Sequence, residues 1–141
     1  MSIWFKNPNV DEVNKTGENT MVSYLGIKIT EMSDDSLTGI MPVSDKVKQP
    51  FGIVHGGANC VLAETLGSLA ANFTLDYSKQ HAVGLSINTS HIKAVRNGTV
   101  TGVAKAVHLG KTTHVWEIKT YNDNGDLTST TQLTMAVINR L

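Results

Sequence analysis

One carboxylate stands alone in the apolar, small-residue stretch between Val54 and Leu75. It belongs to Glu64, and no Lys or Arg lies within four residues on either side. Burying an ionised carboxylate without a partner costs several kcal/mol. Glu64 is therefore paired with a distant group, exposed at an edge, or retained for chemistry. On this feature alone the plain alternative stays open, in which Glu64 points to solvent as most glutamates do.

The neighbours of Glu64 could supply groups for attack on a carbonyl. Ser68 follows four residues later, on the same helix face, where its hydroxyl could bond the carboxylate or a water beside it. Gly56 and Gly57 open the expected helix, where the first N–H groups lack intrahelical partners and the helix dipole favours negative charge. Such donors can form an oxyanion hole.

Two further candidates, His55 and Gln49, precede the helix and could reach the same cleft from the loop. The alternatives are a simple helix cap for His55 and a solvated loop amide for Gln49. Cys60 is expected to be a small buried residue, because no basic group within a turn would lower the pKa of its thiol. The five histidines and single cysteine show no zinc spacing, so no metal site is predicted.

Helix geometry limits how these groups can act together. Glu64 lies eight residues beyond Gly56, or about 12 Å along a helix axis. One helix cannot present both groups to one carbonyl carbon. If both act on the same bond, the carboxylate and the N–H donor come from two copies of the helix, which requires a dimer.

Hydrophobic periodicity predicts an α+β fold with six strands and one long helix. The expected elements are a short helix within 9–16 capped by Asn9, strands within 24–33 and 36–44, a helix from His55 to Leu75, and strands within 82–95, 99–109, 112–122 and 127–141. Turns are expected at Asp34-Asp35, Asn97-Gly98, 109–111 and Asn124-Gly125, and Gly26 and Gly39 are interpreted as possible bulges.

Only one helix is long enough, at roughly 30 Å, to cover one face of the predicted sheet. The sheet should therefore wrap around it. Apolar residues occur nearly all round this helix, which indicates burial on most sides. We therefore expect a homo-oligomer whose dimer interface runs near the helix.

Length and charge limit the number of domains in the chain and the kinds of partner that it can bind. A chain of 141 residues fits a single domain, 1–141. Zero net charge and no cluster of basic residues argue against nucleic acid as a partner. No signal-like start and no run of about 20 apolar residues argue against a membrane association. The expected location is the cytoplasm, in agreement with one cysteine.

Together these residues resemble the hotdog-fold acyl-CoA thioesterases, in the branch with 4-hydroxybenzoyl-CoA and 1,4-dihydroxy-2-naphthoyl-CoA thioesterases. The resemblance covers almost the whole chain and rests on Gln49, the "HGG" at 55–57, Glu64, the "SHIK" at 90–93 and "VHLGKTTHVWEI" at 107–118. It implies a hotdog fold, in which a six-stranded antiparallel sheet wraps one central helix. It also implies a homodimer with composite active sites, usually assembled as a homotetramer, and no cofactor, since coenzyme A is part of the substrate.

The resemblance also implies roles for the candidate residues. Glu64 would be the nucleophile or general base of thioester hydrolysis, and the Gly56 N–H of the neighbouring subunit would polarise the carbonyl. Gln49 would position substrate or water, His55 would steady the reacting end and the leaving thiol, and Ser68 would support the carboxylate.

Substrate contacts are implied for a second set of residues. His91 would line the acyl pocket, and Val83 and Gly84 would offer backbone groups to the pantetheine arm. The nucleotide end would meet Lys93 and the turn that contains His108, Gly110 and Lys111. The alternative for these basic residues is that they are ordinary solvated side chains on turns.

The leading hypothesis is hydrolysis of an aromatic or bicyclic acyl-CoA, similar to 1,4-dihydroxy-2-naphthoyl-CoA, within menaquinone biosynthesis. A thioesterase of broad or fatty-acyl preference, acting on coenzyme A or carrier-protein thioesters, is the enzymatic alternative. A non-catalytic acyl-thioester-binding module is the alternative from another class. A hotdog dehydratase fits less well, because its His and acidic pair are not matched.

Overall fold

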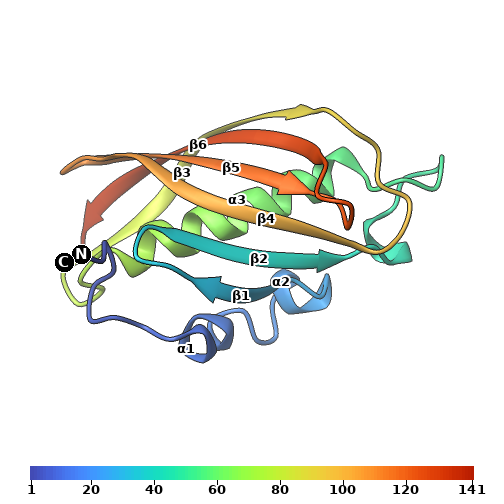
Figure 1. Ribbon diagram of the computed structural model, residues 1–141. Helices are drawn as coiled ribbons and strands as arrows, with labels where there is room; N and C mark the ends of the chain where they lie inside the picture. The colour runs from blue at the N-terminus through green and yellow to red at the C-terminus, as the bar shows by residue number, and fades with distance from the viewer.

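The computed structural model describes residues 1–141 and consists of a six-stranded antiparallel sheet curved around one long helix (Figure 1). The strands are β1 (Lys28–Met32), β2 (Ser36–Pro42), β3 (Gln80–His91), β4 (Thr99–Leu109), β5 (Thr113–Tyr121) and β6 (Leu127–Asn139), in the sheet order β1-β2-β4-β5-β6-β3. The helices are α1 (Val10–Lys15), α2 (Met21–Tyr24), α3 (Gly56–Phe73) and a short 3₁₀ helix (Asp45–Val47). The predicted hotdog architecture is confirmed.

Two glycines let α3 approach the sheet closely. Gly39 on β2 and Gly102 on β4 are cross-strand partners. A Cβ at either position would lie 2.6 Å from a methyl group of Leu66, which is fully buried on α3. The paired glycines therefore form a hole into which Leu66 packs, and this contact fixes the position of α3 along the sheet.

The core lies between α3 and the inner face of the sheet. Alternate residues of β5, including Trp116 and Ile118, are fully buried, while Glu117 between them is exposed. Leu133 and Met135 continue the same layer on β6. This alternation of buried and exposed residues is the one expected from the sequence.

The segment before β1 differs from the prediction. Residues 21–24 form α2, whereas a strand was predicted from Tyr24. Thr20 caps this helix and Ser23 completes a capping box, so local hydrogen bonds outweigh the strand-like composition. Gly26 has φ +76° and ends the helix in the left-handed region, where glycine is favoured. The strand begins only at Lys28.

The possible bulge at Gly26 was wrong, whereas Gly39 lies opposite one. The pairing of β1 with β2 is irregular between Ile29 and Glu31, whose partners are Gly39 and Thr38, so the extra residue belongs to β1. The missing side chain of Gly39 also serves the packing of α3. Glycine in a strand is ambiguous between a bulge and a close approach, which is why the sequence alone did not separate the two.

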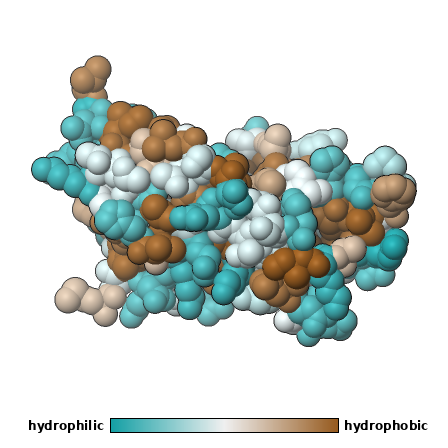
Figure 2. All heavy atoms as spheres, turned by 90° about the horizontal axis from the view of Figure 1, so that it is seen from above, coloured by the Kyte–Doolittle hydropathy of each residue, from teal (hydrophilic) through white to brown (hydrophobic).

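The strand β3 forms one edge of the sheet and pairs only with β6. Its apolar side chains Val83, Leu85 and Ile87 are 39%, 63% and 36% exposed. A view from above shows apolar groups interspersed among polar ones on this side of the molecule (Figure 2). A long edge with exposed apolar residues is a ready surface for pairing with another strand.

None of the helices is both long and apolar enough to cross a membrane.

Candidate active site

The start of α3 carries an unused hydrogen-bond donor. His55 is the N-cap, and its Nδ1 accepts the N–H of Gly57 at 2.8 Å. A neutral His55 ring therefore holds its proton on Nε2. The N–H groups of Ala58 and Asn59 both donate to the His55 carbonyl. The Gly56 N–H has no partner within the chain and remains free to bind an anionic oxygen.

His91, at the end of β3, packs directly on this helix start. A Cβ at Gly56 would lie 2.9 Å from His91 Nε2, so only glycine leaves room for the ring. The Nδ1 of His91 lies 3.5 Å from Asn59 Nδ2, and Asn59 is only 6% exposed, with its Oδ1 unpartnered. Sequence reasoning missed Asn59. The clue in the sequence was an amide side chain within an apolar helix whose other residues were expected to be buried.

Glu64 lies in an open groove on the side of α3 away from the core. The groove has a volume of about 420 Å³ and is also lined by Met21, Val22, Cys60, Val61, Thr65, Ser68 and Leu69. The Glu64 carboxylate is exposed and makes neither an ion pair nor a hydrogen bond. A Cβ at Gly84 would lie 3.0 Å from Glu64 Oε2. The carboxylate therefore sits over β3, at the edge of the sheet.

Two expected neighbours do not contact Glu64 within one chain. Ser68 lines the same groove, but no hydrogen bond joins its hydroxyl to the carboxylate. The Gln49 side chain accepts the N–H of Phe51 and so turns back into its own loop. Cys60, expected to be buried, is half-buried in the groove.

The expected substrate contacts fall at two ends of β3. Val83 pairs with Ala136, which pairs with Thr113 at the start of β5. The turn with His108, Gly110 and Lys111 therefore lies near Val83 and Gly84. Lys93 follows the other end of β3, where its Nζ lies 2.8 Å from Asp126 Oδ2. The hydrogen bond from Lys93 holds the pKa of Asp126 below its usual range.

The site residues thus form two groups within a single chain. Gly56 and His91 lie together at the helix start, while Glu64 and Gly84 lie together further along. Gly84 and His91 are seven positions apart on β3, or about 23 Å for an extended strand. One chain does not bring the free N–H and the carboxylate together. No three His, Cys, Asp or Glu side chains are grouped as metal ligands.

Buried hydroxyl groups on the inner face of the sheet were also missed. Thr89 and Thr131 share a hydrogen bond of 2.8 Å, and Thr120 bonds both Thr128 and Ser129. Because they bond one another, the hydroxyls of the buried Thr120, Thr128, Ser129 and Thr131 avoid the cost of unsatisfied polar atoms, while Thr89 is half-buried. Ser129 and Thr131 follow strand periodicity in "LTSTTQLT", but Thr128 is adjacent to Ser129, and Thr is common on exposed strand faces too.

A six-stranded antiparallel sheet wrapped around one long helix is the architecture of the hotdog-fold thioesterases. The model of the Thioesterase superfamily matches residues 51–129. The chain belongs to this superfamily, and its relatives identify it as a thioester hydrolase.

The similarity to known relatives extends over nearly the whole chain. It is 40% identical to the 1,4-dihydroxy-2-naphthoyl-CoA hydrolase of Escherichia coli, over 96% of this chain and 99% of the relative. The crystal structure of a mutant thioesterase from Pseudomonas aeruginosa is 43% identical, with a TM-score of 0.97, and covers 99% of this chain and 100% of that one. A thioesterase of Haemophilus influenzae is 39% identical, with a TM-score of 0.94, and covers 97% of this chain and 95% of that one.

Proposed function

We propose that the protein hydrolyses an acyl-CoA thioester to the free acid and coenzyme A, with Glu64 as nucleophile or general base. The observation that carries this proposal is the unpaired Glu64 carboxylate, held in a groove whose walls are mostly apolar. A thioester needs no metal for this reaction, because its carbonyl is electrophilic and a thiolate leaves readily. The carboxylate and one oriented donor are sufficient.

The donor is the Gly56 N–H of a second subunit. It has no partner within its own chain, and it stands at a helix start where the dipole favours the negative charge that develops on the carbonyl oxygen. His55 steadies the reacting end and the leaving thiol through its exposed Nε2. Gln49 positions the substrate or the attacking water once its loop opens towards the cleft, and Ser68 supports the carboxylate.

Pairing of β3 with β3 of a second copy would assemble this site. A two-fold axis near Ile87 and Asn88, midway between Gly84 and His91 in the sequence, would place Gly84 opposite the partner's His91. Glu64 lies over Gly84, and His91 packs on Gly56. The carboxylate of one subunit would then face the free N–H of the other. The exposed apolar residues of the β3 edge support such a homodimer, which we further propose to associate into a homotetramer.

The same dimer would join the two halves of the coenzyme A contact. Lys93 lies at the opposite end of β3 from Val83 and the turn at 108–111. Antiparallel pairing of two β3 strands would bring the Lys93 side chain of one subunit to the Val83 end of the other. The nucleotide would then meet Lys93 from one chain and His108, Gly110 and Lys111 from the other, while Val83 and Gly84 bond the pantetheine arm.

For the acyl group we propose an aromatic or bicyclic acid, similar to the 1,4-dihydroxy-2-naphthoyl group that the Escherichia coli relative is named for. The ring would lie in the groove beside Thr65, with His91 of the partner at its edge. This substrate would place the protein in menaquinone biosynthesis, in the cytoplasm.

The test compares wild-type and Glu64→Ala proteins on 1,4-dihydroxy-2-naphthoyl-CoA and 4-hydroxybenzoyl-CoA, with release of free thiol as the readout. We expect kcat to fall at least about 1000-fold in the variant, with an unchanged melting temperature. Glu18→Ala, at an exposed carboxylate outside the groove, is the matched control. Near-normal turnover by Glu64→Ala would refute the catalytic role.

A further inference from the structure

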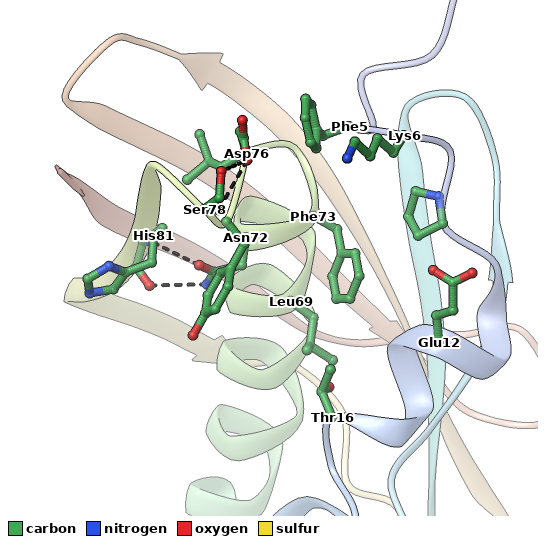
Figure 3. Close-up of a pocket in the computed structure, with 14 residues that line it drawn as sticks. Phe5, Lys6, Glu12, Thr16, Leu69, Asn72, Phe73, Asp76, Ser78 and His81 are labelled. Carbon is green, nitrogen blue, oxygen red and sulfur yellow. Dashed lines mark hydrogen bonds between the residues drawn. The ribbon is translucent and has the colours of Figure 1, made fainter. Parts of the chain in front are cut away.

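Two asparagines on α3 contact the edge strand β3, and only one of them uses all of its amide for hydrogen bonds. Asn72, near the C-terminal end of α3, donates to the Ala82 carbonyl at 3.1 Å and accepts the Ala82 N–H at 2.8 Å (Figure 3). Asn59, near the start of α3, lies beside the His91 ring, and its Oδ1 has no partner. Asn72 therefore fastens α3 to the backbone of β3, whereas Asn59 contacts a side chain of that strand.

The position of Asn59 is costly for the stability of the fold. Its side chain is almost fully buried, so its amide has lost the hydrogen bonds that water would supply. An unpaired buried acceptor is destabilising, and an apolar residue of the same shape would avoid that cost. Stability therefore does not explain this amide, and we look for its role in the contact of its Nδ2 with His91.

The contact with Asn59 determines which nitrogen of His91 carries the proton. The Nδ2 of Asn59 can only donate, so His91 Nδ1, at 3.5 Å, is the acceptor. In a neutral ring the proton then lies on Nε2. At 3.5 Å this bond is long, and hydrogen bonds in active sites commonly shorten when the substrate binds. His55 is held in the same way, because its Nδ1 accepts the Gly57 N–H.

The Nε2 of His91 lies close to the free N–H of Gly56. A Cβ at Gly56 would be 2.9 Å from this Nε2. The backbone nitrogen of Gly56 is about 2.5 Å from that Cβ position by standard geometry, so the two nitrogens are no more than about 5.4 Å apart. One oxygen can accept hydrogen bonds from two donors at this separation, because each bond spans about 2.9 Å.

We propose that Asn59 is a positioning residue that holds the His91 ring in place and in its Nε2–H form, so that His91 adds a second donor beside the Gly56 N–H. This inference rests on the proposed hydrolysis, in which the Gly56 N–H polarises the thioester carbonyl. A neutral imidazole beside a helix start can polarise a carbonyl through its N–H, without carrying a charge itself. The carbonyl oxygen of an aryl thioester lies beside the ring, where the partner's His91 is proposed to lie.

A double-mutant cycle on 4-hydroxybenzoyl-CoA tests whether Asn59 acts through His91. Asn59→Leu keeps the branched shape without the amide, and Asn59→Ala repeats the test without added volume. We expect His91→Phe to lower kcat about 100-fold, as the loss of one carbonyl donor does. Either Asn59 variant should lower kcat about 3- to 10-fold, the effect of one hydrogen bond, with little change in KM. In a His91→Phe background the same variants should change kcat by less than about twofold.

Asn14→Leu is the matched control for the loss of an amide. Asn14 bonds the backbone of Ile29 on both sides and does not line the Glu64 groove. This variant should lower the melting temperature and leave kcat within about twofold of wild type. An equal loss of kcat from the Asn59 variants in both backgrounds, or no loss in either, would overturn the proposal.

The tautomer itself is measured by long-range ¹H–¹⁵N NMR of the ligand-free protein at pH 8, with the His91 signals identified by their absence in His91→Phe. We expect a protonated Nε2 in the wild type and a shift towards a protonated Nδ1 in both Asn59 variants. A protonated Nδ1 in the wild type, or unchanged spectra in the variants, would overturn the proposal. Because this measurement needs no turnover, the expected spectra from a protein that hydrolyses no thioester would support the effect of Asn59 on His91, and the proposed function would fail by itself.

Discussion

At the scale of single residues, the site depends on glycines that make room for functional side chains. Gly84 leaves space for the Glu64 carboxylate, and Gly56 leaves space for His91. Neither glycine has a positive φ, so the requirement comes from contact with a side chain rather than from backbone conformation. A substitution at either position should therefore affect activity more than folding.

Gly84→Ala tests this directly. The added methyl group would lie 3.0 Å from Glu64 Oε2, so the carboxylate must move. The shift required is a few tenths of an ångström. Because a displacement of about 1 Å can cost about 100-fold in rate, we expect kcat/KM to fall about 3- to 10-fold. Ser86→Ala, on the same strand, is the control. Steady-state kinetics measure the change in kcat/KM, and thermal melts show whether the variant remains folded. Full activity in Gly84→Ala would contradict the observed placement of Glu64.

A buried histidine makes stability depend on pH. His114 is 2% exposed and accepts the Trp116 Nε1–H at 3.3 Å, and burial, with a smaller effect from His108, lowers its pKa from the usual 6.5. The imidazole of His114 therefore takes up a proton more readily in the unfolded chain than in the folded chain. Stability from this residue is complete above about pH 6.5 and falls as the pH drops towards the lowered value.

Urea unfolding between pH 7.5 and 5.5 measures this effect. Wild type should lose stability across that range, and His114→Gln, which keeps an acceptor for Trp116, should lose less. Equal pH dependence in the two proteins would exclude His114 as the source.

At the scale of elements, the position of α3 follows from the packing of Leu66 between Gly39 and Gly102. Gly102→Ala would place a methyl group 2.6 Å from a Leu66 methyl group in a fully buried layer. Overpacking of this kind costs about 1–3 kcal/mol in the free energy of unfolding. In a Leu66→Ala background the same substitution should cost much less, because the clash is gone. Equal costs in both backgrounds, measured by urea unfolding, would rule out the proposed contact.

The sequence predicted the elements that have strong periodicity or clear turn residues. The four strands after α3 and α3 itself were found to within a few residues, because Asn97-Gly98 and Asn124-Gly125 mark their turns and β5 alternates cleanly. The helix α2 was missed, because four residues carry no periodicity and their capping bonds become visible only in three dimensions. The roles of Gly39 and Gly102 depend on a partner distant in sequence, which local patterns do not reveal.

The candidate site was predictable only as a set of residue types. Glu64 and the glycines at the start of α3 stood out from the sequence because of their apolar surroundings and their spacing. The contact of His91 with Gly56, and that of Glu64 with Gly84, join residues that are 35 and 20 positions apart. Asn59 stood out only as an amide within an apolar helix, which does not by itself separate it from an exposed amide. The short helix capped by Asn9 was predicted and is found as α1, whereas residues 1–8 carried no prediction.

At the scale of the whole molecule, the free edge of β3 and the two separated residue groups point to a dimer as the active unit. Ile87→Lys would place a charge near the proposed two-fold axis, where two copies would repel each other. We expect this variant to be monomeric by light scattering and to lose at least about 100-fold in kcat/KM. Thr101→Lys, on β4 away from this edge, is the control. A monomer with full activity would refute the composite site.

The most direct test of the central claim mixes two inactive proteins. Gly56→Pro removes the free N–H at a helix position that tolerates proline, after a His55 with a compatible ψ of 134°. Gly56→Ala keeps the N–H and controls for the contact with His91. Gly56→Pro and Glu64→Ala are unfolded together and refolded, and heterodimers are quantified by mass spectrometry. If each site takes Gly56 from one subunit and Glu64 from the other, every heterodimer holds one intact site, and activity returns to roughly a quarter of the wild-type value. Heterodimers without activity would contradict the shared site.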